Sequence, residues 1–75
     1  MLELVKYVAQ ALVDHPDQVD VRQVENADSI VIELRVAPED MGKVIGKQGR
    51  IAKSIRTIVK AATIKDEKPT FVEIV

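Results

Sequence analysis

Val44-Ile45-Gly46-Lys47-Gln48-Gly49-Arg50 is the stretch that decides how the second half of this 75-residue chain folds. Its two glycines lie three positions apart, between two segments with the apolar periodicity of helices. We expect Gly46 to end the first helix in a left-handed conformation, and Gly49 to let the backbone turn tightly and another backbone come close. The second helix begins at once, so its free N–H groups and its dipole favour an anion such as phosphate beside the loop.

Positive charge gathers around this loop, although the whole chain has a net charge of −1. Residues 42–65 hold seven of the 11 Lys and Arg residues and none of the 12 Asp and Glu residues. Lys47 and Arg50 border the loop, and the amide of Gln48 can hydrogen-bond a phosphate or a sugar. A basic segment in an acidic body predicts binding of a phosphate backbone on one face and its repulsion elsewhere.

Helices are expected at 2–13, at about 39–45 and at about 50–62. In each, apolar residues recur three or four positions apart, as in amphipathic helices. The first helix ends before Pro16, and Pro38 suits the first turn of the second. The predicted buried stripe of the third helix consists of Ile51, Ile55, Ile58, Val59 and Ala62. Its opposite, solvated side carries Lys53, Arg56 and Lys60, with Arg50 at the edge.

Strands are expected at 19–24, 30–36 and 70–75, which are rich in β-branched residues. In the second strand Ile32 and Leu34 share one face with the other even-numbered apolar residues. The polar turn at 25–28 predicts that the first two strands form an antiparallel hairpin. Val24 breaks the alternation, which predicts a bulge or a strand end. The order α-β-β-α-α-β predicts an α+β fold with helices layered on one face of a three-stranded sheet.

The composition indicates one small domain, 1–75, with a thin core. There is no cysteine, no apolar run of the roughly 20 residues that span a bilayer and no signal peptide, so the cytoplasm is the expected location and no membrane partner is expected. Asp14, Asp17 and Asp20 lack the glycine and the distal Glu of a calcium loop, so we expect no metal and no cofactor. No nucleophile–base pair indicates an enzyme.

Two other phosphate-binding loops fit the glycine pattern less well. A Walker A loop has four residues between its first glycine and the Gly-Lys pair, followed by Ser or Thr. Here three residues separate Gly42 from Gly46, and Gln48 stands where the magnesium-binding hydroxyl is needed. The dinucleotide fingerprint Gly-x-Gly-x-x-Gly is also absent. Nucleotide hydrolysis and hydride transfer are therefore not expected.

Ile45-Gly46-Lys47-Gln48-Gly49, between two helices with a strand before and after them, resembles the GXXG loop of KH domains. In that family the loop clamps about four nucleotides by their backbone. The additional helix and strand at the N-terminus resemble the type II arrangement, and the resemblance covers nearly the whole chain. The length of the chain and the run 46–56 are similar to the short bacterial single-KH proteins of the KhpA type.

This resemblance implies single-stranded RNA as the partner. The residues expected to bind it are Ile45, Gly46, Lys47, Gln48, Gly49, Arg50 and Lys53. The bases would lie in a groove walled by the two helices that flank the loop and by the strand at 30–36. Many KH domains have a large aliphatic residue where this chain has Ala52, so the base preference stays open. Tyr7 and Phe71 are far from the loop in sequence, so stacking of bases on aromatic rings is not expected.

The same resemblance implies a cellular role for RNA binding, which is the first hypothesis, and an alternative function. The role is that of an RNA-binding post-transcriptional regulator or RNA chaperone linked to cell elongation and division. The alternative is a protein-interaction adaptor that acts mainly by homodimerisation, or by heterodimerisation with a larger Jag-type (KhpB) KH protein. Two weak RNA sites joined in a dimer would also gain avidity.

Overall fold

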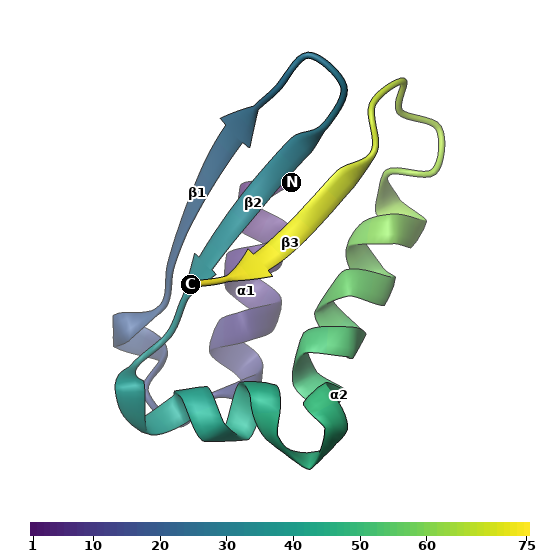
Figure 1. Cartoon of the computed structure of the whole chain (residues 1–75). Helices are drawn as coiled ribbons and strands as arrows, with labels where there is room; N and C mark the ends of the chain where they lie inside the picture. The colour runs from purple at the N-terminus through teal and green to yellow at the C-terminus, as the bar shows by residue number, and fades with distance from the viewer.

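The computed structural model describes residues 1–46 and 49–75; Lys47 and Gln48, two of the predicted site residues, lie outside the described residues. The elements are α1 (Leu2–Leu12), the 3-10 helix η1 (Pro16–Gln18), β1 (Asp20–Glu25), β2 (Ile30–Arg35), α2 (Pro38–Ala62) and β3 (Thr70–Ile74). Figure 1 shows α2 to be sharply bent, and its two arms are the helices predicted at about 39–45 and 50–62. The predicted order is confirmed, with η1 as an addition.

The strands form one sheet in the order β1-β2-β3, and the helices cover one of its faces (Figure 1). β1 and β2 pair as the predicted antiparallel hairpin, in an unbroken register from Asp20↔Arg35 to Glu25↔Ile30. The sheet therefore has neither a bulge nor a strand end at Val24. β3 pairs with β2 in parallel, which requires the chain to cross over through α2. This crossover places β3 at the edge of the sheet that lies beside α2.

The core lies between the inner face of the sheet and the helices. Ile32 and Leu34 of β2 are fully buried, as their alternation predicts, and Val36 follows on the same face. The residues packed around them from the helices and from β3 are Val5, Ala9, Val44, Ile55, Val59 and Val72. Burying one such aliphatic side chain contributes about 1.5–3 kcal/mol to the free energy of unfolding. These contacts hold α1 and both arms of α2 against one face of the sheet.

The second arm of α2 buries only part of the predicted stripe. Its buried residues are Ala52, Ile55 and Val59, and Thr63, directly after the helix, is buried in line with them. The prediction is confirmed at Ile55 and Val59, and Ile51 is partly buried against the core. The prediction was wrong at Ile58, which is 38% exposed, and at Ala62, which is exposed as well. Apolar periodicity marks a broad face of a helix, whereas the sheet and α1 cover only a narrower strip of it. Ala52 is 5% exposed and belongs to the core, so it forms no open groove floor.

Asp40 joins the start of α2 to the end of α1, and it is only 1% exposed. Its Oδ1 accepts a hydrogen bond from the backbone N–H of Asp14 at 3.1 Å, and its Oδ2 accepts one from the N–H of His15 at 2.9 Å. The carboxylate thereby satisfies two donors just beyond α1. Lys43 adds an ion pair with Asp14 at 3.1 Å. The first arm of α2 is thus anchored to α1 before the chain reaches the bend.

Candidate nucleic-acid interface

The bend in α2 contains a left-handed residue, Gly49, whose φ is 67°. Residues with a Cβ resist this conformation, so a glycine is needed at this position. The prediction that Gly46 would adopt it was wrong, because the φ of Gly46 is not positive. The helical backbone of the first arm continues through Gly46, and the reversal of hand falls on the second glycine instead.

Both glycines of the bend leave open space beside the backbone. We consider a Cβ added to Gly46 or Gly49 and leave aside the neighbouring residues and the nearby backbone of the same helix. In the described part of the chain, no other heavy atom lies within 4 Å of this Cβ. Ile45, directly before them, keeps 53% of its surface exposed. The backbone of another molecule can therefore approach the bend closely at these two positions.

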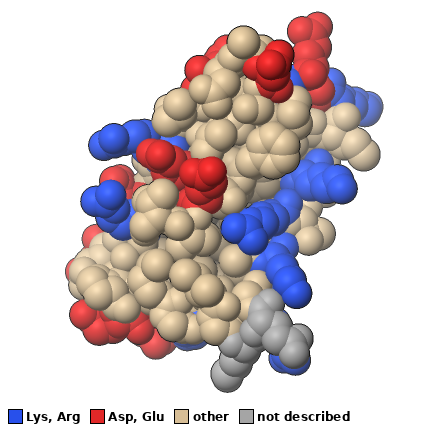
Figure 2. Space-filling model, viewed as in Figure 1, with Lys and Arg blue, Asp and Glu red and all other residues tan. Residues whose placement is uncertain are grey.

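Positive charge follows the second arm away from the bend. The residues that carry it, called the basic stripe below, are Arg50, Lys53, Arg56 and Lys60. All four are exposed, and their spacing of three or four positions puts them on one side of the helix. Figure 2 shows Lys and Arg gathered along this side of the molecule. Within the described ranges, no carboxylate lies within 4.0 Å of the charged nitrogens of the stripe.

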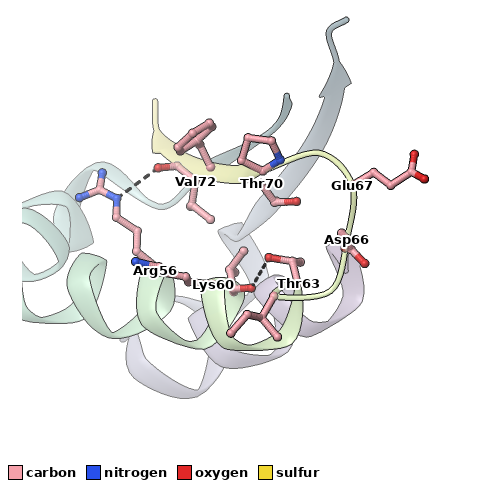
Figure 3. Close-up of a pocket in the computed structure, with 11 residues that line it drawn as sticks. Arg56, Lys60, Thr63, Asp66, Glu67, Thr70 and Val72 are labelled. Carbon is pink, nitrogen blue, oxygen red and sulfur yellow. Dashed lines mark hydrogen bonds between the residues drawn. The ribbon is translucent and has the colours of Figure 1, made fainter. Parts of the chain in front are cut away.

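A groove of about 530 Å³ lies beside the end of the second arm (Figure 3). This α2–β3 groove is lined by Arg56, Val59, Lys60, Thr63, Ile64, Asp66, Glu67, Pro69, Thr70, Phe71 and Val72. The strand at 30–36, which was expected to form a wall beside the loop, does not line this groove. β2 is the central strand, and its Ile32 and Leu34 are fully buried beneath the helices. β3 forms the wall because the parallel crossover sets it at the edge beside α2.

Arg56 connects the basic stripe to the α2–β3 groove. Its Nε donates a hydrogen bond to the backbone carbonyl of Val72 at 3.2 Å (Figure 3). On either side of β3, the carbonyl of Pro69 accepts from Ile30 at 2.9 Å and the N–H of Val75 donates to Leu34 at 3.0 Å, whereas the carbonyl of Val72 accepts from the arginine. Sequence reasoning put Arg56 on an exposed helix face; its contact with β3 and its place in the groove come only from the structure.

Phe71 is a second groove residue that sequence reasoning missed. It is 55% exposed and lines the groove, although it lies far along the chain from the bend. The return of the chain through β3 brings this residue to the groove. An exposed aromatic ring offers a surface on which an unpaired base can stack. Stacking was not expected because both aromatic residues are far from the loop in sequence; Phe71 nevertheless lines this groove, whereas Tyr7 does not.

The structure places five of the predicted site residues along the bend and the start of the second arm. They are Ile45, Gly46, Gly49, Arg50 and Lys53. The surface offers a ligand an open backbone, positive charge and a largely apolar groove. Across residues 1–46 and 49–75, no group of three or more His, Cys, Asp or Glu side chains could hold a metal ion. None of the helices, as far as the structure describes them, is long and apolar enough to cross a membrane.

Comparison with known proteins gives consistent matches. The family model for the KH domain of KhpA and KhpB matches residues 2–74. The RNA-binding protein KhpA of Caldanaerobacter subterraneus is 64% identical over 75 residues, and that of Clostridium perfringens is 61% identical, with each alignment covering 100% of both chains. The RNA-binding protein KhpA of Aquifex aeolicus is 49% identical over 72 residues, which cover 96% of this chain and 91% of that protein.

Proposed function

The chain belongs to the KhpA/KhpB KH-domain family, and from this premise we propose that it binds single-stranded RNA. The bend of α2 holds the backbone of the strand, and the α2–β3 groove takes its bases. The observation that carries the proposal is the basic stripe, whose cations run from the bend to the groove without a carboxylate partner among the described residues. The RNA-binding proteins among the relatives support the same class of ligand.

Each part of this surface supplies a different interaction. The open space at Gly46 and Gly49 supports close approach of phosphates, and the N-terminal end of the second arm favours their charge. The apolar lining of the groove, with Phe71, supports contact with the faces of bases. If about three phosphates are neutralised, the log–log dependence of the binding constant on salt has a slope near −2. Binding by a single site is therefore weak and strongly salt-dependent.

The test replaces Lys47 and Gln48 together by Asp and measures binding to a pool of single-stranded RNA by fluorescence anisotropy. Binding should fall by about tenfold or more, because the loop would carry negative charge in place of positive. The control variant, Lys6→Asp with Gln18→Asp, makes the same change of charge at exposed positions on α1 and η1 and should bind nearly as the natural chain does. Thermal unfolding verifies that both variants fold. Unchanged RNA binding in the loop variant would show that the loop is not the site.

A partner-binding adaptor is the second candidate, favoured by large apolar side chains that stay exposed. Tyr7 keeps 73% of its surface exposed and Ile64 keeps 79%. Covering them in a homodimer, or in a heterodimer with a larger Jag-type (KhpB) KH protein, would add buried area to a thin core. Light scattering separates the two roles, because an adaptor keeps its association in the loop variant that has lost RNA. A strictly monomeric chain at high concentration argues against self-association.

The cellular part of the proposal comes from the family resemblance alone. It is a cytoplasmic role as a post-transcriptional regulator or RNA chaperone, connected with cell elongation and division. Crosslinking of bound RNAs in cells, compared between the natural chain and the loop variant, tests this role. RNAs that crosslink equally to both chains would contradict it.

A further inference from the structure

The α2–β3 groove has basic residues along the second arm and two acidic residues at its rim, where the carboxylate of Glu67 is turned outward (Figure 3). Arg56 and Lys60 line it along the second arm, and Asp66 and Glu67 line it where the chain leaves α2 for β3. Arg56 and Lys60 also belong to the basic stripe, so a strand held at the bend reaches the groove at its positive end. The groove is short, because the seven helical steps from Arg56 to Thr63 span only about 10 Å.

The lysines next to these two acids in sequence do not neutralise them. Lys68 is directed to the β1–β2 turn, where its Nζ contacts Oε2 of Glu25 at 2.8 Å and donates to the backbone carbonyl of Asn26 at 3.0 Å. Lys65 is exposed and does not line the groove. In the part of the chain that the structure describes, no Lys or Arg nitrogen lies within 4.0 Å of the carboxylates of Asp66 or Glu67.

The end of α2 adds to the negative charge at the same place. A helix carries a partial negative charge at its C-terminus, where its last carbonyls lack helical partners. Thr63, directly after α2, lines the groove, so this helix end faces the same space as the two acids. The N–H and the Oγ1 of Thr63 both donate to the carbonyl of Val59, at 3.0 and 2.8 Å. Thr63 therefore gives no hydrogen bond to the carbonyls of the helix residues after Val59. A phosphate is therefore disfavoured at this end of the groove by side chains and by backbone.

We propose that Asp66 and Glu67 end the path of the bound RNA strand. The inference rests on the proposed function, since it concerns RNA held at the bend and in the α2–β3 groove. A strand that enters past Arg56 gains from the basic stripe, places its bases in the groove and then meets two carboxylates. Their repulsion turns the strand away from the surface, so the protein contacts only the roughly four nucleotides that a GXXG loop clamps, however long the RNA is.

The experiment compares the natural chain with the variant Asp66→Asn with Glu67→Gln, using single-stranded RNAs of randomised sequence, four, eight and twelve nucleotides long, at low salt. For the natural chain, affinity should grow with length only as the number of possible binding positions grows. For the variant, the twelve-nucleotide strand should bind about threefold more tightly than the number of binding positions predicts. The reason is that the strand can continue along a surface that no longer repels it.

A matched variant, Glu3→Gln with Asp17→Asn, removes the same two charges at exposed positions outside the groove. It should keep the length dependence of the natural chain, which excludes a general effect of net charge. The inference is overturned if the groove variant shows the natural length dependence, or if the matched variant shows the same extra gain. A natural chain that binds none of the oligonucleotides overturns the proposed function, and the inference with it.

Discussion

Gly46 and Gly49 are the two glycines of the GXXG pattern, but their backbones adopt different conformations. Gly49 adopts the left-handed conformation, whereas Gly46 does not. In the described chain, a methyl group added to either glycine would have room, because no other part of the protein lies within 4 Å of it. At the scale of the single residue, folding therefore depends on the second glycine, and the close approach of a ligand can be tested separately at the first.

Replacing Gly46 by Ala should leave the free energy of unfolding unchanged or raise it by up to about 1 kcal/mol, because the residue is helical and its surroundings are open. RNA binding should fall by about tenfold, since the methyl group takes space that the strand needs. Replacing Gly49 by Ala should instead lower the free energy of unfolding by about 1–2 kcal/mol, the cost of a left-handed residue with a Cβ. Urea unfolding and RNA titration measure both effects. Full RNA affinity in Gly46→Ala would mean that no backbone approaches there.

At the scale of the elements, Asp40 determines how the first arm of α2 meets α1. The two backbone donors that it satisfies belong to residues just beyond α1, so one side chain in the first turn of α2 holds the chain that follows α1. Glu39, its neighbour, is exposed and lies 3.7 Å from the imidazole of His15. The two acids at the start of α2 are alike in sequence, but only Asp40 is part of the packed structure.

Replacing Asp40 by Ala should lower the free energy of unfolding by about 2–4 kcal/mol, because two partly buried N–H groups lose their acceptor. Replacing Glu39 by Ala should change it by no more than about 1 kcal/mol, as is usual for an exposed pair. Urea unfolding followed by circular dichroism compares the two variants. Equal losses of stability would contradict the role given to Asp40.

At the scale of the whole molecule, one ion pair connects the two loops at the same end of the sheet. Lys68, in the loop after α2, contacts Glu25 at the end of β1 at 2.8 Å. The hydrogen bond from Lys68, and then its charge, hold the pKa of Glu25 below its ordinary value of 4.5. Because the pKa is lower in the folded state, the pair stabilises the fold above this ordinary value. The contribution is lost as the pH falls through the folded-state pKa.

Replacing Lys68 by Met should therefore raise the pKa of Glu25 back toward its ordinary value. A titration of the side-chain carboxyl carbon by NMR measures this pKa directly. The variant Lys65→Met removes a charge from the same loop without touching Glu25 and should leave its pKa unchanged. A depressed pKa that persists in Lys68→Met would assign the shift to another group.

The sequence by itself determined the order of the elements, the hairpin and the inner face of β2. These features follow from local rules: a strand turns alternate side chains to opposite faces, and a proline or a polar turn ends an element wherever it stands. The concentration of charge in 42–65 was also readable, because it depends on composition alone. For the same reason, the loop from Gly46 to Gly49 was recognisable before its backbone conformation was known.

Only the tertiary structure decided which partner covers each face. It exposed Ile58, buried Asp40, and brought Phe71 and Arg56, from separate elements, into one groove. Periodicity shows which residues share a face, but not how much of that face a neighbour covers. The groove exists because the parallel pairing of β3 with β2 returns the end of the chain to the second arm of α2. That pairing is a contact between distant residues, and no local pattern in the sequence specifies it.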